Sequence, residues 1–241
     1  MMQSLRPALP IFALALLAGA SVWADTPKAK TPSVTNGGRA GYPMPGAPAE
    51  RPPAGPTVIL DPAKTEAGTY SLDTHHVALL GKITHNLSSW SVFRLDAVSG
   101  ALDWNPKHPE KSKLSISADP RSITSVDKTF QEELKDPYFL NADKFPTISF
   151  VSTSARSTGP GKGRLTGNMT FLGVTRPMTF DVIFNGASKR GTNFFTLGFS
   201  ARGMLDVSDY GWAGVPATGD ILRLELDGEF NRGERPPIPN R

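Results

Sequence analysis

The sequence contains four histidines, the side chains best suited to metal binding or acid-base chemistry near neutral pH. His75 and His76 are adjacent, so a β-strand would place them on opposite faces. His75 and His85 share a face, but at about 3.3 Å per residue about 30 Å would separate them along one straight strand. His108 stands between a lysine and a proline in a turn pattern, where we expect it to face solvent. The spacing therefore predicts no metal site, and favours single histidines that form hydrogen bonds within the fold.

Acidic residues and nucleophile motifs give no catalytic pattern either. Glu225, Asp227 and Glu229 share one strand face, but it is the face opposite two leucines, which predicts a solvated ladder and not a pair of carboxylates in a cleft. The sequence contains no Gly-x-Ser-x-Gly motif, and the glycine-rich stretch 159–163 is predicted to be a hairpin tip and not a phosphate-binding loop. We predict a protein that is not an enzyme, with no catalytic residues and no cofactor. A periplasmic hydrolase remains as a residual alternative.

Composition excludes further classes of protein. The 241 residues are 39% hydrophobic, which is enough for a core, and none is cysteine, so disulfides and thiolate sites are excluded. The net charge is +4, but no basic run is longer than the pair Lys189-Arg190. Nucleic acid is therefore not an expected partner.

The two ends of the chain differ in composition from its centre. A basic start, an apolar stretch and small residues before position 24 predict a signal peptide over 1–24, because the apolar stretch is too short for a membrane span. Residues 25–67 form a Pro/Gly/Ala-rich leader that we predict to be flexible and dispensable for folding, although its apolar run Val58-Ile59-Leu60 could dock on the domain. We assign 68–232 to the folded domain and 233–241 to a disordered tail. The predicted location is the periplasm.

The domain itself alternates apolar and polar residues in short segments, which is typical of β-strands with one buried face. About eight such segments predict an all-β fold, an antiparallel eight-stranded barrel that closes on itself. Charged residues occupy the outward face, so we expect a soluble barrel and not one in the outer membrane. One stretch, 125–135, instead has helical spacing at Val126, Phe130 and Leu134, after a capping-box-like start at Thr124. It predicts one short helix across the barrel wall or mouth.

Several motifs together resemble one known family over nearly the whole domain. They are Tyr70-Ser71-Leu72-Asp73 with His76 and His85, Val98-Ser99-Gly100-Ala101-Leu102-Asp103, Ser112-Lys113-Leu114, Ser122-Ile123, Leu134, Phe139-Leu140, Phe145-Pro146-Thr147-Ile148-Ser149-Phe150, Leu165-Thr166-Gly167-Asn168-Met169-Thr170, Gly173-Val174-Thr175-Arg176-Pro177 and Ser208-Asp209-Tyr210-Gly211. This set resembles the YceI family of periplasmic lipid-binding proteins. The sequence departs from the family pattern at Gly81, where the family usually has an aromatic residue, and at Val77, where it usually has serine. The resemblance implies an extended lipocalin-like barrel whose interior holds a polyisoprenoid or another long-chain amphiphile, with no reaction catalysed.

These inferences predict a carrier or sequestering protein for a polyprenyl phosphate, an isoprenoid quinone or a fatty acid or amide. The alternative is a ligand-free structural or stress-response protein of the envelope, because the same side chains could fill the barrel completely. A homodimer and a transient contact with the envelope membrane are compatible with either. The residues predicted to bind the ligand are large apolar side chains on the inward face of the strands: Ile116, Phe150, Met169, Phe171, Phe180, Phe184, Phe199 and Leu224.

Overall fold

A computed structural model of the chain describes residues 57–212 and 218–234. The predicted signal peptide, most of the leader and residues 235–241 of the predicted tail lie outside these ranges. The described residues are mostly strands, joined into one sheet.

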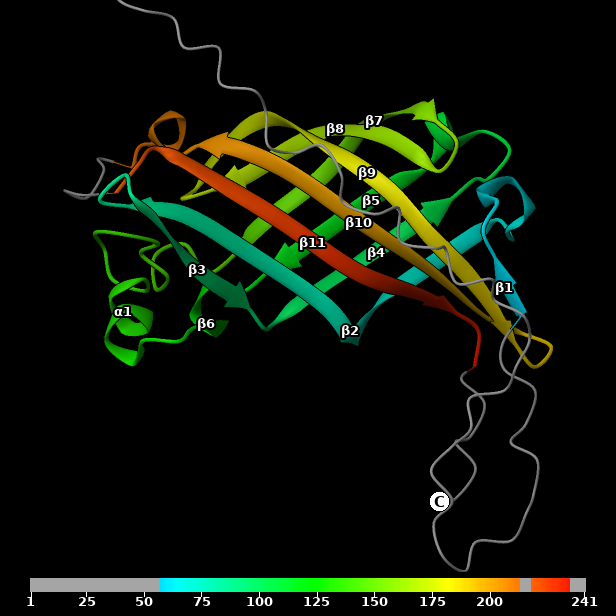
Figure 1. Ribbon diagram of the computed structural model, residues 1–241, viewed down its shortest axis with the longest axis horizontal. Helices are drawn as coiled ribbons and strands as arrows, with labels where there is room; N and C mark the ends of the chain where they lie inside the picture. The colour runs from blue at the N-terminus through cyan, green and yellow to red at the C-terminus, as the bar shows by residue number, and fades with distance from the viewer. Residues whose placement is uncertain (1–56, 213–217, 235–241) are drawn as a thin grey trace, which may run out of the picture. The chain divides into compact units, whose positions relative to one another are not determined.

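Eight strands of this sheet form a closed antiparallel barrel, as predicted (Figure 1). Each is paired with the next, and the last pairs with the first, so the ring has no free edge. Their bounds are β2 (Gly68–His85), β4 (Val98–Trp104), β5 (Lys113–Ala118), β7 (Ile148–Gly159), β8 (Lys162–Phe171), β9 (Val174–Arg190), β10 (Phe194–Asp206) and β11 (Ile221–Arg232).

Strand β2 is longer than the sequence indicates. The segments 70–73 and 77–85, which the alternation suggests as two strands, form one bent strand of 18 residues. Its first part pairs with β4, and its last part pairs with β3 (Ser89–Leu95), which turns at 96–97 into β4. The stretch 92–104, which strand alternation predicts as a single strand, is therefore divided between β3 and β4. Strand β6 (Ile123–Ser125) extends the sheet beyond β3.

The helix is shorter than predicted and begins later. Helix α1 (Lys128–Glu133) is capped by Asp127, whose carboxylate accepts hydrogen bonds from the backbone N–H groups of Thr129 and Phe130 at 2.8 and 3.2 Å. The predicted start at residue 125 and the predicted cap at Thr124 are wrong, because 123–125 are paired as β6. Val126, expected on the buried stripe, is fully exposed.

The segment around α1 packs at one end of the barrel, beside β6 (Figure 1). Phe130 contacts Phe139 with ring centroids 6.3 Å apart, and Phe139 lies 6.0 Å from Trp212. Leu134 and Leu140 are buried in the barrel core. The helix and the loop that follows it therefore cover one end of the barrel interior.

The end of the predicted leader is part of the fold. Strand β1 (Thr57–Ile59) pairs with β9, and a 3-10 turn, η1 (Pro62–Lys64), follows it. Thr65 is buried, and its hydroxyl accepts a 2.7 Å hydrogen bond from the Trp104 indole N–H. The short apolar run at 58–60, which the sequence suggests could dock on the domain, does so through β1.

Three further 3-10 turns complete the elements of the described chain: η2 (Pro109–Lys111), η3 (Pro120–Ser122) and η4 (Val207–Tyr210). No helix among the described residues is long and apolar enough to cross a membrane.

Candidate ligand-binding cavity

The barrel encloses an apolar space, here called the inner cavity, toward the end that α1 covers. Its volume is about 80 Å³. Leu140 from the segment after α1 lies on its wall, and Ser149 supplies a polar group to a lining that is otherwise entirely apolar. Six of the residues predicted to bind a ligand line it: Ile116, Phe150, Met169, Phe171, Phe180 and Leu224.

A second space, the mouth cavity, lies toward the β7–β8 hairpin and has a volume of about 160 Å³. It is lined by the other two predicted residues, Phe184 and Phe199, and reaches Gly159 and Gly161 at the hairpin tip. Trp104 and Pro62 also line it, so the docked N-terminal segment contributes to the wall. The structure thus places all eight predicted residues on cavity walls; that they contact a ligand stays a prediction.

The two cavities meet at one ring of residues. Leu114, Leu165, Ala201 and Leu226 line both, and they come from four different strands of the barrel. We call this ring the neck. The shared neck places the two cavities next to each other along the barrel, so a long hydrocarbon tail that passes the neck would occupy both.

Aromatic rings form much of the wall and are held by edge contacts. Phe150 and Phe180 meet with centroids 5.0 Å apart and nearly perpendicular planes. Phe199 lies 5.4 Å from Phe184 and 5.5 Å from Trp104. Edge-to-face pairs of this kind contribute about 0.5–1.5 kcal/mol each beyond burial, so they help to hold the rings of the wall in position.

Phe93, which the sequence analysis did not select, compensates for the unusual Gly81. The two residues are paired across β2 and β3, and a Cβ atom at Gly81 would lie only 2.2 Å from Cε2 of the Phe93 ring. The Phe93 ring therefore occupies the position that a side chain at 81 would take, and it lines the inner cavity. Strand alternation could have identified Phe93, since it shares parity with the buried Leu95.

The charged residues that line the mouth cavity are all basic: Lys113, Arg156, Lys162 and Arg164. No Asp or Glu of the described residues lines it. Arg156 and Arg164 are directly opposite each other on β7 and β8, an arrangement that like charges disfavour. Arg164 is partly neutralised by Asp181, whose carboxylate accepts a 3.1 Å bond from its Nε. The register places these four basic residues on the outer face of their strands, opposite the face that carries Leu114 and Leu165, so the positive charge lies around the outer rim of the mouth.

A separate polar group lies where β2 bends. Leu72 pairs with Phe230 and Val77 with Gly228, so residues 73–76 of β2 lie opposite Glu229 alone. This bulge ends the strict alternation of faces, and His75 and His76 are both exposed. The prediction that adjacent histidines lie on opposite faces is therefore wrong at this position.

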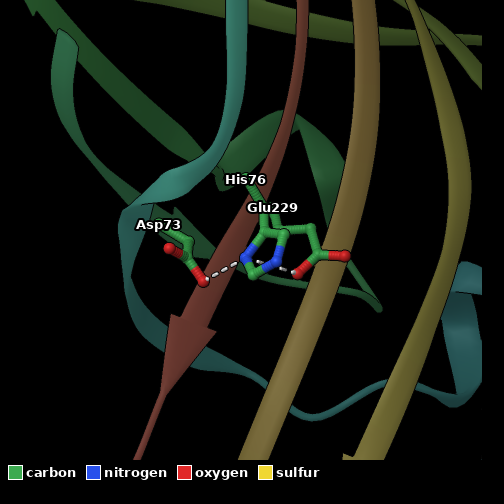
Figure 2. A group of neighbouring side chains, drawn as sticks. All are labelled: Asp73, His76 and Glu229. Carbon is green, nitrogen blue, oxygen red and sulfur yellow. Dashed lines mark hydrogen bonds and ion pairs between the residues drawn. The ribbon is translucent and has the colours of Figure 1, made fainter. Parts of the chain in front are cut away.

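Within the bulge, the side chains of Asp73, His76 and Glu229 converge (Figure 2). His76 Nδ1 lies 2.9 Å from Asp73 Oδ2 and 3.9 Å from Glu229 Oε2. Asp73 is buried, with 8% exposure, and burial alone would raise the pKa of its carboxyl. Hydrogen bonds from His76, the His75 backbone N–H and Asn231 outweigh burial and lower that pKa to about 2.

The remaining polar candidates lie apart from this group. His85 contacts Asn86, and the exposed His108 pairs with Glu110 at 3.2 Å. Glu225 pairs with Lys82 at 3.0 Å, and Asp227 accepts a hydrogen bond from Ser200, so both face the outside of the barrel as expected. Glu229, predicted to be the third member of that ladder, instead joins the bulge.

Comparison with known proteins gives a consistent picture. The family described as YceI-like domain matches residues 70–230. A UPF0312 protein of Pseudomonas putida strain F1 is 32% identical over 175 residues, which are 72% of this chain and 91% of the relative.

Three solved structures share the fold. BcnA of Burkholderia cenocepacia has a TM-score of 0.57 at 15% identity, covering 66% of this chain and 98% of its own. A YCEI protein of Campylobacter jejuni has a TM-score of 0.55 at 24% identity, covering 59% and 85%. A polyisoprenoid binding domain from Saccharophagus degradans has a TM-score of 0.52 at 10% identity, covering 70% and 100%.

Proposed function

The chain belongs to the YceI family, and from this premise we propose that it binds one long-chain isoprenoid or similar amphiphile inside its barrel. The observation that carries the proposal is the pair of cavities in the barrel, the inner cavity and the mouth cavity, which lie next to each other and share the neck residues. The solved polyisoprenoid binding domain, whose fold is similar, supports the same class of ligand.

The cavities favour a ligand-binding barrel over a ligand-free structural protein. Protein interiors are close-packed, and voids larger than a water molecule are few. An apolar void leaves its lining atoms without contact partners, which costs stability unless something fills it. Two adjacent cavities of about 80 and 160 Å³ are therefore the arrangement expected of a barrel that a ligand completes.

The positive charge around the mouth favours one class of head group on the ligand. The tail would lie in the inner cavity, and the head group would lie at the mouth, whose outer rim carries Lys113, Arg156, Lys162 and Arg164. Arg binds phosphate and carboxylate groups through paired hydrogen bonds, so these cations favour an anionic head group. Of the candidate ligands, a polyprenyl phosphate fits better than an uncharged isoprenoid quinone.

The N-terminal sequence pattern supports an exported protein that acts in the periplasm. There it would carry the lipid through the aqueous space or sequester it, and the described residues give no arrangement that calls for catalysis. Transfer to and from a membrane requires only that the tail leave through the mouth cavity.

Native mass spectrometry of the protein recovered from its own envelope tests the proposal. We expect a complex heavier than the denatured chain by the mass of one lipid, and organic extraction should release that lipid. Phe180→Asp, prepared in parallel, should carry less of it. Recovery of the bare chain alone, under conditions that preserve lipid in a known lipid-binding control, would contradict the proposal.

A further inference from the structure

We propose that Asp73, His76 and Glu229 bind one divalent transition-metal ion, with zinc the expected occupant, at the bulge between β2 and β11. This site is separate from the lipid cavity, because none of the three residues lines either cavity. It does not depend on the proposed function.

The donor set is suited to such an ion. One imidazole nitrogen and two carboxylate oxygens are ligands that Zn²⁺ accepts at about 2.0–2.2 Å. In a tetrahedral site, donors at that distance lie roughly 3.3–3.5 Å from one another. Here the three donor atoms lie within 4.8 Å of one another, with His76 Nδ1 at 2.9 Å from Asp73 Oδ2 and 3.9 Å from Glu229 Oε2. The first of these distances is slightly short, the second is slightly long, and the two carboxylates lie up to 4.8 Å apart. Glu229 must therefore move toward Asp73 by up to about 1 Å to admit an ion.

The charge at the bulge favours a cation. Among the residues that the structure describes, no Lys or Arg forms an ion pair with Asp73 or Glu229, whose only such neighbour is His76. When His76 is neutral, two carboxylates therefore face each other across it with no compensating charge. A divalent ion would neutralise both.

The bulge holds one ligand in place and leaves the others accessible. Asp73 is fixed by Asn231 Nδ2, which donates to its Oδ2 at 2.7 Å, and Asn231 is in turn held by the Thr196 hydroxyl at 2.7 Å. Such outer hydrogen bonds orient metal ligands. The side chains of His76 and Glu229 are 49% and 45% exposed, so an ion can enter from solvent and keep water as a fourth ligand.

The ion would link the two strands that close the barrel. β2 and β11 are paired on both sides of the bulge but not within it. A bound ion would join β2, through Asp73 and His76, to β11, through Glu229. At an ion concentration about 100 times the Kd, the melting temperature should rise by roughly 5–10 °C.

Titration of the chelator-treated protein with Zn²⁺ alone tests the proposal, with calorimetry and melting as readouts. We expect saturable binding of one ion per chain in the parent. Glu229→Gln should weaken it by about 10- to 100-fold or more and remove the rise in melting temperature. Without metal, this variant should melt like the parent, because the nearest partner of Glu229 is 3.9 Å away.

His108→Gln is the matched control, since it removes a histidine with a single carboxylate partner and should leave binding unchanged. His76→Gln tests the nitrogen ligand in the same assay and should abolish binding. The proposal is overturned if the parent shows no saturable binding, if Glu229→Gln and His76→Gln bind like the parent, or if His108→Gln is the variant that loses the ion.

Discussion

Replacing Phe180 tests which face of the barrel is the ligand-binding face. Its ring lies on the wall of the inner cavity, 5.0 Å from the Phe150 ring. The ring also packs against Gly203, where a Cβ atom would lie only 2.8 Å from Phe180 Cδ1. Phe180→Leu keeps an apolar wall but loses the edge contact and some buried area. We expect it to fold with a loss of about 1–2 kcal/mol in the free energy of unfolding.

Phe180→Asp should be much more damaging. The loss of the whole ring costs about 3–5 kcal/mol, and the new carboxyl group lies on an apolar wall, where burial raises its pKa. The sum is a large part of the 5–15 kcal/mol that stabilises a typical domain. Val151→Asp is the matched control, because Val151 follows Phe150 on the same strand but is 52% exposed. It should change stability by about 0.5 kcal/mol or less.

Urea unfolding of the three variants beside the parent measures these differences, provided that the slope of unfolding against urea stays the same. Lipid binding should fall by about 4- to 15-fold in Phe180→Leu, since one or two methylene-sized contacts of about 0.8 kcal/mol each are lost. A Phe180→Asp variant as stable as the parent, with Val151→Asp destabilised, would refute the face assignment.

Three further changes follow from the geometry. Ala201→Phe should block the neck, so that lipids with short tails still bind while longer tails gain no further affinity. The measurement is affinity against tail length, and an unchanged length dependence would argue against a tail that passes the neck. In the metal-free protein, Asp73 has a folded pKa of about 2 against about 3.9 when unfolded, so its contribution of about 2 kcal/mol is present above pH 4 and is lost as the pH falls toward 2. Asp73→Asn should remove this acid dependence in urea unfolding at a series of pH values, whereas an unchanged profile would mean that other carboxyl groups cause it. Removal of the chain before Glu66 deletes β1 and Thr65, the partner of Trp104, and should lower stability by about 1–3 kcal/mol; melting identical to that of the full chain would show that this segment contributes nothing.

Strand alternation was sufficient to predict much of the barrel and its inward face. In β8 and β9 the residues Met169, Phe171, Met178 and Phe184 alternate with polar neighbours, and all four are buried. Because a strand has a period of two, one correctly assigned residue fixes the face of all the others until the pairing changes. The predicted ligand residues reach the cavity walls for this reason.

The features that the sequence did not reveal depend on contacts between distant segments. The alternation indicates a break between 70–73 and 77–85, but it does not show that the break is a bulge opposite Glu229, so the approach of Glu229 to His76 could not be inferred. Docking of β1 depends on pairing with β9, more than 120 residues further along the chain. Asp127 caps α1 because β6 pairs with β3, and the helical spacing alone cannot show that pairing.

Titration of the delipidated protein with polyprenyl phosphates that differ only in tail length tests the central claim most directly. If the tail lies in the joined cavities, affinity should increase with each added isoprene unit, by up to about 0.8 kcal/mol for each buried methylene equivalent, and should level off once the cavities are full. An affinity that is independent of tail length from the shortest member onward would contradict a ligand held inside the barrel.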